Sequence, residues 1–286
     1  MQCSADPFVH KFLAEERIRN MNDNCTAPCQ NRQVYAAEDH PMTVYIWDMD
    51  ETLILLKSLL DGTYAGVFHG LKDFKTGLEI GKRWENLILQ VCDDHFFYEE
   101  GLHNILDEKM IKIWDDLYNL TDSYTDRWLS SGHALLEKAL GRNMVSNPDV
   151  VSSELAPVSI KTERQSINVL VTSGSLIPSL VKCLLYRLDD VISHDNVYSS
   201  WEVGKLQCFN WIKKRFTGPN VQFCVIGDGL EECAAAEAMR WPFVKIDMRP
   251  NGPHRFPGLT LGTIQSYIDV IYGPPDADAK SSCGVN

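Results

Sequence analysis

The sequence predicts an α/β fold, in which a doubly wound parallel sheet carries an inserted all-helical segment. Short runs of β-branched and other apolar residues precede Asp48, Thr172 and Asp228, as is typical of buried strands. Helical periodicity follows the second and third of these runs, and strands that alternate with helices form parallel sheets. A long stretch with helical periodicity and few strand signals separates the first run from the second.

The composition is that of a globular protein. The 286 residues are 44% hydrophobic and 23% charged, and a chain of this length can bury a substantial core. The net charge of -12 argues against general binding to nucleic acid or to anionic membranes. No apolar stretch reaches the length of a transmembrane helix, and the first residues lack the basic and apolar regions of a signal peptide.

The nine cysteines lack the spacing of a disulfide framework. We therefore expect free thiols in a reducing compartment, the cytoplasm or the nucleus or both. Cys25 and Cys29 are not followed by a second Cys or His pair at zinc spacing, which argues against a zinc site. None of the cysteines has arginine at the sixth following position, so a phosphatase mechanism based on a thiol nucleophile is excluded.

The first predicted strand covers residues 44–47 and ends at two aspartates. Asp48 and Asp50 are separated by one residue, and a Gly-rich turn is expected over residues 61–66. A buried strand that stops at acidic residues delivers them to the carboxyl edge of the sheet, where open α/β folds bind ligands. One carboxylate can then attack a substrate while the other handles a proton. For such a pair taken alone, an acidic loop after a strand is the ordinary alternative.

Residues 71–159 are predicted to form an inserted helical cap. Apolar residues recur at i, i+3, i+4 and i+7 over residues 81–91, and similar periodicity is present over 105–117 and 128–140. We expect the Trp and Tyr residues of this segment to lie in its core. Residues 146–163, rich in Ser, Pro, Val and Glu, are expected to connect the cap to the sheet.

The chain then returns to the sheet through alternating elements. Strands are predicted at 167–171, 221–226 and 243–246, and helices at 177–188, 204–216 and 231–239. The predicted organisation is an N-terminal arm (1–40) with one short amphipathic helix over 12–18, a catalytic core (41–70 and 160–272), the cap, and a disordered tail (273–286).

Residues that could take part in catalysis follow the later predicted strands. Thr172 offers a hydroxyl, and the helix that follows points its positive end at the same place. Asp228 is flanked by glycines, and Glu232 lies one helical turn further on, so both can face the same site. Lys205 supplies a cation at the start of a helix. Taken singly, Thr172 could merely end a strand, Asp228 could cap a helix and Lys205 could lie on the surface.

Taken in order, these residues match the four motifs of the haloacid dehalogenase-like phosphotransferases, which have a Rossmann-like sheet. The D-x-D-E-T segment from Asp48 and the G-D-G-x-E-E segment from Gly227 more closely resemble the Eyes absent family. The resemblance covers roughly residues 40–272. It extends to residues 58–65, to residues 169–172 and to the Leu-Ile-Pro sequence from Leu176.

The resemblance is closest to the short, single-domain members found in plants. Unlike animal members, the sequence has no long Pro/Ser/Thr/Tyr-rich region ahead of the matching segment. Ser173, Gly174 and Ser175 stand where animal members have Thr- and Gln-rich residues.

Membership of this family implies a hydrolase, a Mg²⁺-dependent phosphomonoesterase that acts on protein phosphotyrosine. It implies Asp48 as the nucleophile that forms an aspartyl-phosphate and Asp50 as the acid and base, with Thr172 and Lys205 on the phosphate oxygens. The implied Mg²⁺ ligands are the Asp48 side chain, the Asp50 backbone carbonyl and Asp228, with Glu232 acting through bound water.

Two alternatives remain open at this stage. One is a phosphatase for small metabolites on the same scaffold, which a large closed cap would favour. The other is a co-regulator module that docks a transcription factor; animal members bind Six-type homeodomain proteins. The intact set of catalytic residue types favours an enzyme over a pure scaffold, and a dehalogenase is disfavoured because that chemistry does not require Asp50. We expect no nucleic acid or membrane partner.

Overall fold

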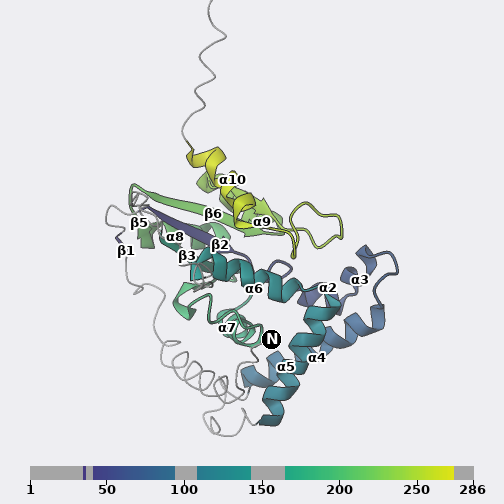
Figure 1. The fold of residues 1–286 in the computed structure, drawn as a ribbon. Coiled ribbons are helices and arrows are strands. Elements are labelled where there is room, and N and C mark those ends of the chain that lie inside the picture. Colours follow the sequence, from purple (N-terminus) through teal and green to yellow (C-terminus); the bar gives the residue numbers. More distant parts are fainter. Residues whose placement is uncertain (1–34, 37–40, 94–107, 143–164, 274–286) are drawn as a thin grey trace, which may run out of the picture.

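A computed structural model describes residues 35–36, 41–93, 108–142 and 165–273, and confirms the predicted parallel sheet (Figure 1). Its five strands lie in the order β4-β3-β2-β6-β7, and every neighbouring pair is parallel. Counted along the chain, this order is 3-2-1-4-5, the order of a Rossmann-like doubly wound sheet. The strands are β2 (Met42–Trp47), β3 (Gln165–Thr172), β4 (Val197–Ser199), β6 (Val221–Gly227) and β7 (Phe243–Lys245).

Alternate residues of the central strand face two separate apolar clusters. Tyr45 and Trp47 belong to the larger cluster, which is covered by α6 (Trp128–Ala139), α7 (Leu176–Leu185) and α10 (Leu261–Tyr272). Val44 and Ile46 belong to the other cluster, beneath α8 (Lys205–Arg215) and α9 (Leu230–Met239). Both faces of the sheet are therefore buried, as parallel sheets require.

The remaining helices lie beyond the carboxyl ends of the strands, at the lower right of Figure 1. They are α2 (Leu56–Leu60), α3 (Thr63–Val67), α4 (Phe74–Cys92) and α5 (Glu108–Tyr124). Trp84, Trp114 and Trp128 are buried in the larger cluster, which confirms the prediction that these rings are core residues. Helix α6 returns to the sheet and contacts β3 and α10.

One local prediction is wrong. The turn expected over residues 61–66 contains most of helix α3, and the chain bends only at Gly62, between α2 and α3. Gly62 has φ of 78°, and a Cβ there would lie 1.8 Å from the Phe74 ring. The glycine therefore permits a tight break between two short helices.

Several short elements and the last helix were not predicted, and several predictions lie outside the described residues. Strand β4 has only three residues, and α10 begins after Thr260, an N-cap whose hydroxyl accepts from the Thr263 amide and which was a usable signal. A separate ladder pairs β1 (Tyr35–Ala36) with β5 (Phe216–Thr217). The helix expected over 12–18, the connection 146–163 and nearly all of the tail 273–286 are not described. Among the described helices, none combines the length and the apolar character that crossing a bilayer requires.

Helix α6 is tied to the segment after α7 by a charged contact. His133 Nε2 lies 3.0 Å from Asp190 Oδ1, and Arg142 donates to the Asp190 carbonyl at 2.7 Å. Burial lowers the pKa of His133. The hydrogen bond and charge of Asp190, with the charge of Glu137, raise this pKa by more than burial lowers it, so the net shift is upward. Protonation of His133 therefore strengthens the contact that ties α6 to Asp190.

We expect His133→Gln to cost more stability at pH 5.5 than at pH 8.5. A raised folded-state pKa contributes stability that is complete below the unfolded value of about 6.5 and is lost as the pH rises through the folded value. The difference should be about 0.5–1 kcal/mol, as for other partly exposed ion pairs. Urea denaturation of both proteins at the two pH values measures it, and an equal cost at both would contradict a charged His133.

Candidate active site

The strand register brings three predicted site residues to one edge of the sheet. Trp47 of β2 is level with Leu170 of β3 and Ile226 of β6. The next residues along the three strands therefore reach the carboxyl edge together, and Asp48, Thr172 and Asp228 lie within one residue of the same level. This is the edge at which open α/β sheets bind ligands.

Asp48 is buried in a charged cluster. Lys205 Nζ donates to Asp48 Oδ1 at 2.6 Å and to Glu232 Oε2 at 2.7 Å. All three side chains are more than nine-tenths buried. An ammonium has three N–H donors, so these two bonds leave one direction of Lys205 for a further acceptor.

Thr52 links Asp48 to Asp228. Its hydroxyl lies 3.3 Å from Asp48 Oδ2 and 3.2 Å from Asp228 Oδ1, and its side chain is fully buried. The backbone amides of Thr52 and the next two residues all donate to the Met49 carbonyl, which folds the chain into a tight turn. From the helical segment, Trp128 Nε1 donates to the Thr52 carbonyl at 3.0 Å. The turn is therefore held on one side by the carboxylates of Asp48 and Asp228 and on the other side by α6.

Glycines allow Glu232 to turn back toward the strand ends. A Cβ at Gly227 would lie 2.7 Å from Glu232 Cγ, and one at Gly229 would lie 2.9 Å from Glu232 Oε1. The Gly229 amide donates to that same oxygen at the start of α9. Carboxylate oxygens of Asp48, Asp228 and Glu232 all lie within 4.8 Å of one another. The close approach of this side chain explains why the motif needs both glycines.

The cluster holds more negative charge than Lys205 compensates. Burial raises the pKa of Asp48 to about 7; Lys205 lowers it, and Glu232 and Asp228 raise it. Burial and the charge of Glu232 also raise the pKa of Asp228. For Glu232, burial acts upward, but Lys205 outweighs it and the pKa is lowered. Two of the three carboxylates therefore resist ionisation unless a further cation is present.

Thr172 lies at the end of β3, where the predicted anion-binding loop begins. Its Oγ1 accepts a hydrogen bond from the Gly174 amide at 3.2 Å, and α7 starts two residues later. The neighbouring strand braces this loop, because Ser199 Oγ donates to the Gly174 carbonyl at 2.8 Å. The N-terminus of α7 therefore follows this strand end closely, and helix N-termini are places where proteins bind anions.

The Asp50 side chain stands apart from the charged cluster around Asp48. Its Oδ1 accepts a hydrogen bond from Lys182 of α7 at 2.7 Å. The Asp50 side chain is 37% exposed, whereas Asp48 is buried. The two aspartates of the D-x-D pair therefore occupy different environments, one enclosed and one open to solvent.

Three residues of this site were missed from the sequence. They are Thr52, Lys182 and Glu231. Glu231 accepts from the Lys205 amide at 3.2 Å and from Ser173 Oγ at 3.4 Å, which joins α8 to the loop after β3. The position of Thr52 directly after the D-x-D-E sequence was a usable signal. Lys182 has none, because only the packing of α7 brings it to the loop after β2.

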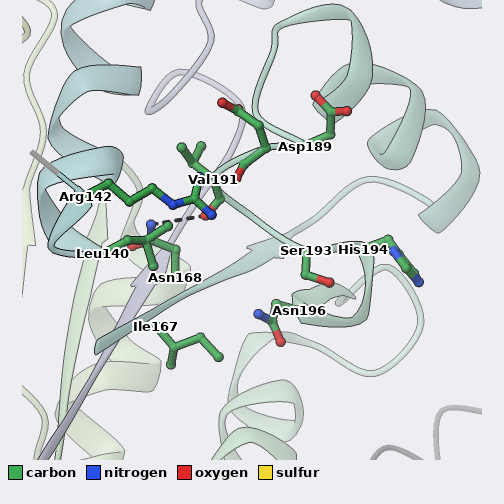
Figure 2. A pocket seen from close by; sticks show the side chains of 10 residues that line it. Leu140, Arg142, Ile167, Asn168, Asp189, Val191, Ser193, His194 and Asn196 are labelled. Carbon is green, nitrogen blue, oxygen red and sulfur yellow. Dashed lines mark hydrogen bonds between the residues drawn. The ribbon is translucent and has the colours of Figure 1, made fainter. Parts of the chain in front are cut away.

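The cavity in Figure 2, of about 290 Å³, lies beside the first half of β3 and the segment 189–196, away from this edge. Asn168 lines it, four residues before Thr172 in β3, or about 13 Å along an extended strand. Arg142 and His194 reach its rim from separate segments. None of the predicted site residues lines this cavity.

The chain is similar to curated protein phosphatases. It is 46% identical to "Protein phosphatase EYA" of Arabidopsis thaliana, a match that covers 85% of this chain and 95% of the relative. It is 30% identical to human "Protein phosphatase EYA1" over 71% of this chain and 42% of that protein, and 28% identical to the Drosophila melanogaster relative over 78% and 36%. The match thus spans less than half of these two animal relatives. No protein-family model matches the chain.

Solved structures with a similar chain path include haloacid dehalogenase-type hydrolases. A dehalogenase with an intermediate complex has a TM-score of 0.37 at 12% identity, covering 76% of this chain and 90% of that one. The HAD-hydrolase YfnB of Bacillus subtilis has the same TM-score and identity, with coverages of 81% and 99%. Likeness at this level carries no weight of its own, and the fold rests on the strand order described above. The identity and coverage shared with the plant relative place the chain in the Eyes absent family of protein phosphatases.

Proposed function

We propose that this haloacid dehalogenase-type phosphatase is a Mg²⁺-dependent protein tyrosine phosphatase that uses Asp48 as its nucleophile. The observation that carries the proposal is the enclosure of Asp48 at the strand edge, between Lys205 and the Asp228 motif. A carboxylate in this position can attack phosphorus while neighbouring groups hold the phosphate oxygens.

The site fits a hard divalent cation. Its donors are all oxygen and lie within 4.8 Å of one another, and burial, together with the charge of Glu232, raises the pKa values of Asp48 and Asp228. Asp48, Asp228 and the backbone carbonyl of Asp50 would hold Mg²⁺, with Glu232 acting through water. The ion supplies neutralisation of the phosphate charge.

The remaining residues divide the transfer into two steps. In the first, an Asp48 oxygen forms a bond to phosphorus as the bond to the phenol oxygen breaks, and Asp50 gives that oxygen a proton. In the second, Asp50 takes a proton from water as the water oxygen attacks phosphorus, and the bond to Asp48 breaks. Lys205 and the Thr172 loop would hold the phosphate oxygens in both steps.

The helical segment is the element we propose to control substrate access. It leaves the sheet immediately after the D-x-D turn, and residues 71–159 would act as a cap over a core of residues 41–70 and 160–272. The relatives named as protein phosphatases favour a phosphoprotein substrate over a metabolite. A transcription-factor partner is a further role that such a surface could serve, without replacing catalysis.

We expect phosphate release from a phosphotyrosine peptide that requires both Mg²⁺ and Asp48. EDTA should abolish it, and Asp48→Asn should reduce it by about 10⁴-fold or more, because the covalent route is lost. Malachite-green detection of phosphate measures the rate. Release only from sugar or nucleotide phosphates would instead indicate metabolite turnover, and no release from any phosphoester would favour the docking-module alternative.

Asp50→Asn should spare p-nitrophenyl phosphate more than the phosphotyrosine peptide. The tyrosine phenol, with a pKa of about 10, needs a proton on leaving more than the more acidic nitrophenol does. We expect a loss of about 10²–10⁴-fold in kcat on the peptide, the usual range for a general acid, and a smaller loss on the nitrophenyl ester. Equal losses on both substrates would remove Asp50 from the acid role.

Mg²⁺ should raise the melting temperature of the wild-type protein in the absence of substrate. A ligand at ten times its Kd stabilises the folded state by about 1.4 kcal/mol. Asp228→Asn should abolish this shift, whereas Asp116→Asn, at an exposed position on α5, should retain it. Differential scanning fluorimetry in EDTA and in Mg²⁺ measures the shift, and an unchanged shift in Asp228→Asn would exclude that residue as a ligand.

A further inference from the structure

Lys182 contacts the D-x-D loop from a distant part of the chain. It lies 132 residues after Asp50, in the last turn of α7, and its Nζ donates to Asp50 Oδ1 at 2.7 Å. The Lys182 side chain is only 15% exposed, so the ammonium is shielded from solvent although its partner Asp50 is not. The helix that begins at the anion-binding loop therefore also reaches the second aspartate.

The backbone on both sides of Asp50 is fixed independently of this contact. Asp50 forms an isolated bridge with Ile54, and the Glu51 amide donates to the Ile54 carbonyl at 2.7 Å. Glu51 has φ of 62°, a left-handed conformation that this tight turn requires. The side-chain torsions of Asp50 are thus the main remaining freedom, and Lys182 restricts them.

The contact uses one carboxylate oxygen and leaves the other open. Among the described residues, Asp50 Oδ1 is bonded to Lys182, and no hydrogen bond to Oδ2 is present. A carboxylate anchored in this way can present its second oxygen to a leaving group or to water. Proton transfer needs that oxygen within hydrogen-bond reach of its target, so a group that fixes its direction affects the rate.

We propose that Lys182 is a positioning residue that directs the free oxygen of Asp50 toward the leaving phenol oxygen. This inference rests on the proposed phosphatase function. In the first step the proton passes from Asp50 Oδ2 to the phenol oxygen as its bond to phosphorus breaks. In the second step the same oxygen takes the proton of the attacking water. Lys182 itself exchanges no proton and touches no substrate atom.

The test compares Lys182→Met and Lys182→Arg with Lys138→Met, a change at an exposed lysine of α6. Lys182→Met should lower kcat on the phosphotyrosine peptide by about 10–100-fold, the usual cost of removing a supporting contact. The loss on p-nitrophenyl phosphate should be several-fold smaller, and KM should change little on either substrate. Arginine should restore part of the rate on the peptide, and Lys138→Met should behave as wild type.

A second measurement separates positioning from a general structural role. In the Asp50→Asn background, Lys182→Met should cause no further loss on the peptide, because the two residues act as one unit. Equal losses on both substrates, or a full further loss in that background, would overturn the inference while leaving the phosphatase function intact. A wild-type protein that releases no phosphate from either substrate would overturn the proposed function itself. Melting temperatures of all variants identify any that fail to fold, in which case Lys182→Gln replaces Lys182→Met.

Discussion

The arrangement of the strand edge depends on one buried ammonium. Lys205 is held between Asp48 and Glu232, with bonds of 2.6 and 2.7 Å, and all three groups have left bulk water. Breaking such a buried pair by removing one partner costs about 3–5 kcal/mol, because a charge is left without compensation. Lys205 of α8 therefore joins Glu232 of α9 to Asp48 at the end of β2. Its positive charge also permits these carboxylates to lie close together.

The parallel sheet brings together the residues that Lys205 then holds in contact. β2 lies at the centre, so its tip has a neighbouring strand on each side, and an even register places the three tips at one level. The helices that start after these strands then direct their N-termini to the same edge. Residues more than 120 positions apart in sequence become neighbours through backbone pairing alone.

Much of this could be predicted because strand ends are encoded locally. Apolar runs that stop at Asp48, Thr172 and Asp228 define both the strands of the sheet and the edge that carries the candidate site residues. The contacts from Lys182 and Trp128 could not be predicted, because they depend on how α7 and α6 pack and neither residue follows a strand. The short strand β4 escaped detection for a related reason, since three residues give too little periodicity to identify. The break at Gly62 was mistaken for a longer turn because helices α2 and α3 have only five residues each.

The hydrogen bond from the Trp128 indole to the Thr52 carbonyl makes helix α6 part of the framework of the candidate site. The same helix contacts the sheet through Asn168, whose amide donates to the Leu136 carbonyl at 3.0 Å. An insertion anchored at this depth is not an interchangeable module. During divergence of the family, any replacement of α6 must therefore also supply a donor for the D-x-D-E-T turn.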